Sequence, residues 1–142
     1  LVGGEESGGI AIKGHIPERD GIWMGITIWE FMAKTGKSLN ELIEEVYAIT
    51  GTFCFERNDL HIDETIKAKV LQNCKSNSYQ QFGKYKVQRI EDLDGYKFFF
   101  DENTWMMIRA SGTEPVLRVY AEAANKEKAD DILADARKVL LG

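Results

Sequence analysis

Four strand-like runs separated by short turns, with an amphipathic helix after them, constrain the fold of this 142-residue chain most strongly. The runs cover residues 85–90, 96–100, 105–110 and 116–123. Turn-forming sequences separate them, such as Asp94-Gly95. Residues 126–141 then repeat apolar side chains at helical spacing. Strands joined by short turns and followed by a helix predict an α+β domain, in which helices cover one face of an antiparallel sheet.

The residues just before these runs extend the same domain. Residues 52–57 have the composition of a further strand, and Asp63 is suited to cap a helix with an apolar face. The polar run at residues 75–83 predicts a loop. We therefore expect residues 51–142 to form one domain.

A helix over residues 22–34 is apolar on most of its circumference. Its polar side chains are Thr27, Glu30 and Lys34, which follow one another at spacings of three and four residues and form one narrow stripe. Asp20 is predicted to cap this helix. Because so little of its surface is polar, the helix must be covered by other elements on several sides.

The rest of the N-terminal part is too small to provide that cover. It offers a short apolar run at residues 10–12 and one further helix, which begins at a capping box over residues 38–41. We expect residues 1–50 to be the helical, C-terminal remnant of an α/β domain whose strands lie upstream of Leu1. The domain boundary is predicted near Gly51.

Composition and charge exclude several classes of function. The formal net charge of −5 argues against a nucleic-acid partner, because binding to a phosphate backbone needs a basic surface. The longest apolar stretch, residues 22–33, is too short to cross a bilayer. The first residues do not have the basic and then apolar pattern of a signal peptide. Cys54 and Cys74 have no metal-ligand spacing. We expect a cytoplasmic protein with two free cysteines, no membrane contact and no metal site in this chain.

The segment between the last two runs has the composition of an anion-binding loop. Residues 109–115 read Arg-Ala-Ser-Gly-Thr-Glu-Pro. A guanidinium offers a planar fork of donors, and hydroxyls and backbone N–H groups around a glycine close on the same anion, so phosphate fits best. Alternation in the next strand places Arg118 near the loop, on the face opposite Leu117 and Val119, as a second cation. The same segment also fits an ordinary hairpin turn with Arg109 in solvent.

Near the N-terminus, residues 4–9 read Gly-Glu-Glu-Ser-Gly-Gly and suit a polyol ligand. Carboxylates accept hydrogen bonds from sugar hydroxyls, a serine hydroxyl donates or accepts, and glycines let a ligand approach the backbone. A mobile Gly-rich loop is the alternative interpretation.

A small basic cluster precedes the first long helix. His15 and Arg19, with Lys13 nearby, are placed to face a phosphate or to move a proton. The alternative is a histidine satisfied by its neighbours at the surface, beside a helix cap.

Taken together, these segments resemble one known family. Residues 4–9 and 109–115 are similar to the sugar-binding and phosphate-binding loops of the α-D-phosphohexomutases, and residues 15–21 are similar to the segment that follows the sugar loop in many members. The resemblance covers essentially the whole chain. In that family the sugar loop belongs to the third of four domains and the phosphate loop to the fourth, a TBP-like α+β domain. The resemblance therefore implies that residues 1–50 end domain 3 and residues 51–142 form domain 4.

The resemblance also implies a reaction. Phosphohexomutases transfer phosphate between the 6- and 1-positions of a hexose through a phosphoserine and a bisphosphorylated intermediate, and they use Mg²⁺. The implied substrate is a hexose phosphate, with glucose 1,6-bisphosphate as intermediate and activator. Glucose is favoured over mannose or glucosamine because Glu6 follows Glu5 and no histidine follows Ser7-Gly8, as in phosphoglucomutase-like members.

Residue by residue, the resemblance implies two sets of ligands. The sugar hydroxyls are assigned to Glu5 and Ser7. The phosphate that is not transferred is assigned to Arg109, Ser111, Gly112, Thr113 and Arg118. His15 and Arg19 are implied to lie near the active site.

Two segments of the family are missing from this chain. They are the nucleophile segment Thr-Ala-Ser-His-Asn-Pro and the metal loop Asp-Gly-Asp-Gly-Asp-Arg, which both precede the sugar loop in the family. The Mg²⁺ ligands and the phosphoserine are therefore expected in upstream domains of the same polypeptide, and this chain alone is predicted to be inactive. A stand-alone module that binds a sugar phosphate without chemistry, or an interaction domain whose loops are ordinary turns, are the other hypotheses.

Overall fold

The structure is a computed structural model that describes residues 2–4, 8–112 and 115–142. The chain divides into two compact units, Leu1–Gly51 and Thr52–Gly142. In the part of the chain that is described, no helix combines the length and the apolar character that crossing a membrane requires.

The first unit contains a two-stranded antiparallel hairpin and two helices. The strands are β1 (Val2–Gly4) and β2 (Ile10–Ile12), and the helices are α1 (Gly21–Thr35) and α2 (Leu39–Thr50). Both helices occur where the sequence predicts them.

The ends of these helices are set by local hydrogen bonds. At the start of α1, Asp20 Oδ1 accepts the N–H of Trp23 at 2.9 Å. Gly36 ends α1 in the left-handed region, at φ 68°, which a residue without a Cβ adopts readily. Ser38 and Glu41 form a capping box at the start of α2. The predicted helix caps at Asp20 and Ser38 are therefore confirmed.

The helices of the first unit leave many apolar side chains in solvent. Every residue of α1 and α2 is described, and none is fully buried. Ile22 is 81% exposed, Trp29 73% and Ile49 87%. Such exposure is unfavourable in water. The described residues therefore do not cover the apolar circumference that the sequence predicts for α1.

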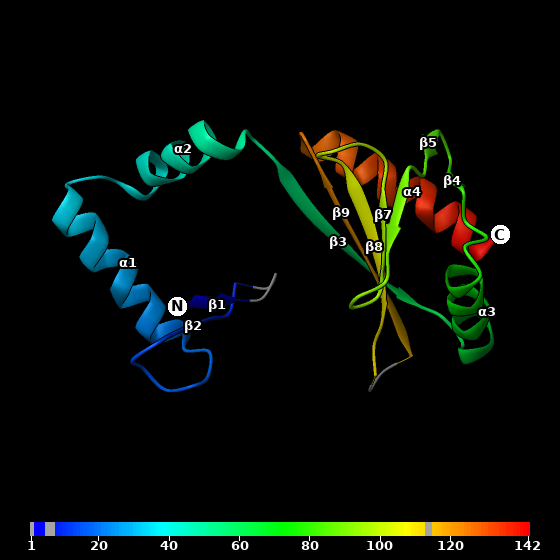
Figure 1. Cartoon of the computed structure of the whole chain (residues 1–142), viewed down its shortest axis with the longest axis horizontal. Helices are drawn as coiled ribbons and strands as arrows, with labels where there is room; N and C mark the ends of the chain where they lie inside the picture. The colour runs from blue at the N-terminus through cyan, green and yellow to red at the C-terminus, as the bar shows by residue number, and fades with distance from the viewer. Residues whose placement is uncertain (1, 5–7, 113–114) are drawn as a thin grey trace. The chain divides into compact units, whose positions relative to one another are not determined.

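The second unit is built on a five-stranded antiparallel sheet (Figure 1). In spatial order the strands are β3 (Cys54–His61), β9 (Val116–Ala123), β8 (Trp105–Ala110), β7 (Tyr96–Phe99) and β6 (Arg89–Glu91). The remaining elements are α3 (Glu64–Lys75), α4 (Lys126–Leu141) and a small hairpin of β4 (Gln81–Phe82) and β5 (Tyr85–Lys86). Figure 1 shows α3 and α4 on the same side of the sheet. The predicted α+β fold, with helices on one face of an antiparallel sheet, is confirmed.

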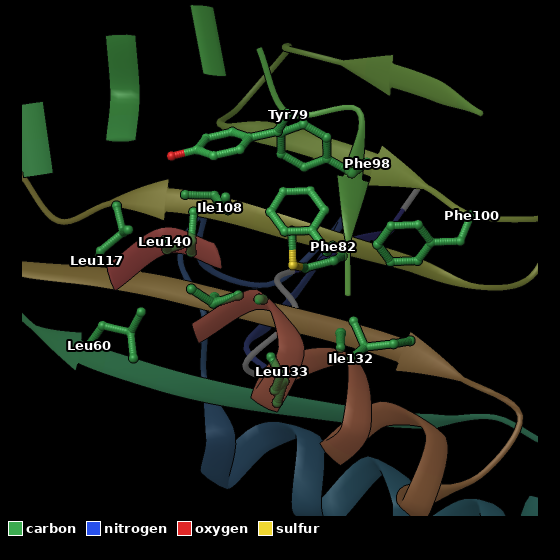
Figure 2. Packing of buried hydrophobic residues seen from close by; sticks show 14 of the residues in the cluster. Leu60, Tyr79, Phe82, Phe98, Phe100, Ile108, Leu117, Ile132, Leu133 and Leu140 are labelled. Atoms are coloured by element: carbon green, nitrogen blue, oxygen red, sulfur yellow. The ribbon is translucent and has the colours of Figure 1, made fainter. Parts of the chain in front are cut away.

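The core lies between this sheet and its two helices (Figure 2). Alternation along β9 sends Leu117 and Val119 into the core and Arg118 to the opposite face, as predicted. The β4–β5 hairpin closes one end, where the rings of Phe82 and Phe98 lie 5.1 Å apart between centroids. The large side chains of the core are Leu60, Val70, Tyr79, Phe82, Phe98, Phe100, Met106, Ile108, Leu117, Val119, Ile132, Leu133 and Leu140.

One predicted strand is wrong. Residues 85–90 form the separate strands β5 and β6, and the chain changes partners between them. Val87 N–H donates to the carbonyl oxygen of Gln80 at 2.9 Å, whereas Gln88 N–H donates to that of Phe99 at 2.8 Å. The predicted loop over residues 75–83 also contains β4. Side-chain alternation persists through a change of partner, so it does not reveal such a break.

Leu117 tests the position of the core. Its side chain is 0% exposed, so Leu117→Ala leaves a cavity and should lower the free energy of unfolding by about 2–5 kcal/mol. Urea unfolding of the 142-residue chain, followed by circular dichroism, measures this change. Leu93, which is 99% exposed, provides the matched control, and Leu93→Ala should alter the free energy by less than about 0.5 kcal/mol. Equal losses in the two variants would contradict this core.

The two cysteines should differ in reactivity. Cys74 is 0% exposed, and burial raises the pKa of its thiol to about 12, whereas Cys54 is partly exposed. Because the thiolate is the reactive form, Cys74 should resist alkylation at pH 8 in the folded chain and react once denaturant is added. Mass spectrometry of a Cys54→Ser variant isolates Cys74. Rapid labelling of this variant without denaturant would show that Cys74 is not buried.

Candidate functional site

The ends of β8 and β9 hold the loop formed by residues 109–115. Ser111 N–H donates to the carbonyl oxygen of Val116 at 3.0 Å, and Ser111 is only 7% exposed. The next residue, Gly112, is exposed. Thr113, a predicted phosphate ligand, lies outside the described residues. Within the loop, a buried and hydrogen-bonded Ser111 is therefore followed by an exposed Gly112.

Arg109 and Arg118 lie on the sheet face that points away from α3 and α4. They stand directly opposite each other in the β8–β9 register, an arrangement in which like charges repel. Carboxylates accompany both arginines. Arg109 Nη2 lies 3.5 Å from Asp94 Oδ2. Asp59 is opposite Arg118 in the β3–β9 register and forms an ion pair with Arg57, at 3.1 Å between Oδ1 and Nε. Two guanidinium groups at the base of one loop can bind an anion that displaces a carboxylate.

Lys67 is a cation beside the loop that the sequence analysis missed. Its Nζ donates to the carbonyl oxygen of Ser111 at 3.1 Å, and it lies 3.3 Å from Glu64 Oε1. The Lys67 side chain is only 12% exposed. Because 44 residues separate Lys67 from Ser111, no motif or spacing connects them, and only the fold brings them together.

In the first unit, Arg19 lies beside the described ends of residues 4–9. The predicted sugar ligands Glu5 and Ser7 lie outside the described residues. A Cβ built on Gly9 would come within 2.6 Å of Arg19 Cδ, so the Arg19 side chain packs directly on Gly9 and would have to shift for a larger residue. A pocket of about 190 Å³ is lined by Gly3, Gly4, Gly9, Ala11, Pro17, Glu18 and Arg19. Arg19 and two glycines of residues 4–9, Gly4 and Gly9, thus line one pocket, whereas Lys13 and His15 do not line it.

His15 is held by two neighbours at the start of α1. Its ring stacks on Trp23, with centroids 4.5 Å apart and an interplanar angle of 9°. Its Nε2 lies 2.9 Å from Asp20 Oδ2. Hydrogen bonds from the backbone N–H of Trp23 and from His15 hold the pKa of Asp20 below its usual value. These contacts give His15 a structural role beside the N-terminal cap.

The chain matches two models of one protein family. Residues 64–139 match the model described as phosphoglucomutase/phosphomannomutase, C-terminal domain. Residues 1–49 match the one described as phosphoglucomutase/phosphomannomutase, alpha/beta/alpha domain III. The two matches follow each other in the order that the resemblance to α-D-phosphohexomutases implies.

Curated relatives agree with these matches. A phosphoglucomutase/phosphomannomutase from Thermococcus kodakarensis is 34% identical over 142 residues, which cover 98% of this chain and 28% of the relative. A phosphoglucosamine mutase from Methanococcus maripaludis is 34% identical over 133 residues, which cover 94% of this chain and 28% of the relative. The chain therefore spans about 28% of the length of these relatives.

A solved structure shares the fold. The crystal structure of a phosphoglucomutase/phosphomannomutase family protein from Burkholderia thailandensis aligns with a TM-score of 0.67 at 19% identity. The alignment covers 98% of this chain and 27% of that protein.

The ion pair between Arg109 and Asp94 predicts competition with anions. Asp94 is 74% exposed, and an exposed pair of this kind contributes up to about 1 kcal/mol. Asp94→Asn should therefore lower the dissociation constant for inorganic phosphate by about 2- to 5-fold, which isothermal titration calorimetry measures. Asp92→Asn, in the same turn, is the matched control and should leave the constant nearly unchanged. Weaker phosphate binding by Asp94→Asn would refute the competition.

Proposed function

Because the chain belongs to the phosphoglucomutase/phosphomannomutase family, we propose that it forms the sugar- and phosphate-binding part of a hexose-phosphate mutase. The whole protein interconverts hexose 1-phosphate and hexose 6-phosphate through a bisphosphate intermediate. The observation that carries this proposal is the loop at residues 109–115, where a buried Ser111 and an exposed Gly112 lie beside two opposed arginines.

In this proposal the two parts of the chain have separate roles. Residues 1–50 are the remnant of the sugar-binding domain, in which Glu5 and Ser7 contact sugar hydroxyls and Arg19 and His15 lie near the active site. Residues 51–142 are the phosphate-binding domain. The two family matches, at residues 1–49 and 64–139, support this division. Upstream domains of the same polypeptide complete the substrate site.

The loop anchors the phosphate that is not being transferred. A bisphosphate intermediate must present first one end and then the other to a single nucleophile, so one site has to hold the idle phosphate in both orientations. Charge-assisted bonds to fixed groups orient the substrate for the transfer. The groups proposed to form these bonds are Arg109, Ser111, Gly112, Thr113 and Arg118.

The described residues do not fit a Mg²⁺ site. Mg²⁺ prefers carboxylate oxygen ligands, and in residues 2–4, 8–112 and 115–142 no group of three or more His, Cys, Asp or Glu side chains is arranged to hold a metal ion. We therefore propose that upstream domains supply the Mg²⁺ ligands and the phosphoserine, and that this chain alone does not catalyse the transfer.

The substrate is proposed to be a hexose phosphate, with glucose favoured by residues 4–9. The relatives named phosphoglucosamine mutase favour glucosamine phosphate as the second candidate. Rates of the complete protein with glucose, mannose and glucosamine 1-phosphates separate these possibilities. A complete protein that binds these compounds and converts none of them would instead be a sugar-phosphate-binding module.

Arg109 tests the phosphate anchor. Removing a charged partner of a hydrogen bond costs about 1.5–3 kcal/mol, so Arg109→Ala should raise KM for the hexose phosphate about 10- to 100-fold in the complete protein. Steady-state kinetics with Mg²⁺ measure this change. Arg137→Ala, which removes an exposed arginine from α4, is the matched control and should leave KM unchanged. Unchanged kinetics for Arg109→Ala would refute the assignment of the loop.

A further inference from the structure

Lys67 joins α3 to the loop at residues 109–115. Its Nζ donates to the carbonyl oxygen of Ser111 at 3.1 Å, and its side chain is 12% exposed. A lysine side chain keeps its ammonium in water wherever it can, because the charged group is strongly hydrated. A lysine that is held largely out of solvent, with its ammonium on a backbone carbonyl and beside the Glu64 carboxylate, therefore indicates a specific contact.

This contact fixes the direction of the next N–H group. The carbonyl of Ser111 and the N–H of Gly112 belong to the same peptide unit, and in a planar trans peptide the two point in opposite directions. Because the carbonyl points at Lys67 on α3, the N–H of Gly112 points away from α3. Gly112 is exposed, and a Cβ built on it would meet no described atom within 4 Å. The exposed backbone of Gly112 is therefore accessible to a ligand.

The residue before this peptide is fixed as well. Ser111 N–H donates to the carbonyl oxygen of Val116 at 3.0 Å, and Ser111 is 7% exposed. The backbone of Ser111 is therefore held through its N–H by β9 and through its carbonyl by α3. A cation on the carbonyl also polarises the peptide unit, which makes the N–H at its other end a stronger donor.

We propose that Lys67 is a positioning residue for phosphate binding, which holds the Ser111 carbonyl so that the Gly112 N–H is aimed at the bound phosphate. This inference rests on the proposed function of the loop as a phosphate anchor. Lys67 does not touch the phosphate. It acts through the Ser111–Gly112 peptide unit, and a donor of similar length and charge should replace it.

The test is a titration of the ¹⁵N-labelled 142-residue chain with inorganic phosphate, followed at the amide of Gly112. Lys67→Met removes the donor and keeps much of the stem, and it should weaken phosphate binding about 10-fold, the effect of one charge-assisted hydrogen bond. Lys67→Arg should restore the affinity to within about 3-fold of the original chain. Lys69→Met, an exposed lysine two positions further along α3, is the matched control and should bind phosphate like the original chain.

The outcomes separate this inference from the proposed function. If the original chain and Lys69→Met bind phosphate at Gly112 and Lys67→Met binds it equally well, the positioning role is refuted while the phosphate anchor stands. If phosphate leaves the Gly112 amide of the original chain unchanged, the proposed function fails and this inference fails with it. If Lys67→Arg folds, as judged by its amide spectrum, but binds as weakly as Lys67→Met, the contact between a cation and the Ser111 carbonyl is not what matters.

Discussion

The opposition of Arg109 and Arg118 across β8 and β9 is the constraint on which the candidate site depends. The register of the two strands places the two arginines directly opposite each other, and like charges in that position are unfavourable. The pairing persists because the other face of the same strands is buried, with Ile108 and Leu117 at 0% exposure. Burial of apolar side chains on one face of the sheet thus keeps the two arginines opposite each other on the other face. A phosphate dianion bound there, as proposed, would reduce the repulsion between them.

The two units differ in how much of their apolar surface they bury among their own residues. The second unit has a continuous core between its sheet and α3 and α4, so the groups around residues 109–115 rest on rigid elements (Figure 2). The first unit leaves Ile22, Trp29 and Ile49 largely exposed. If the proposed function holds, we expect phosphate affinity to reside in this chain and the choice of sugar to depend on the domains that complete the first unit.

Much of the fold follows from the sequence because its signals are local. Caps at Asp20, Ser38 and Asp63 and the alternation along β9 each depend on neighbouring residues. The break between β5 and β6 was missed because it depends on a change of partner strand. β3 also extends beyond its predicted end to His61, because it pairs with β9 along its full length.

The residues of the candidate site also fall into those that the sequence predicts and those that only the fold brings to the loop. Arg109 and Arg118 could be placed beside each other because they flank one hairpin, so the register follows from the turn. Lys67 and Asp94 could not be placed, since each comes from a different part of the chain and reaches the loop only through tertiary packing. Spacing along the sequence carries no information about contacts of that kind.

The loop at residues 109–115 is proposed to bind the phosphate of a hexose phosphate. A crystal structure of the complete protein with glucose 1-phosphate tests it most directly. We expect phosphate oxygens within about 3 Å of the Arg109 guanidinium and of the Gly112 nitrogen. A hexose phosphate bound in the same crystal with its phosphate groups on other residues, and with neither Arg109 nor Gly112 in contact, would contradict it.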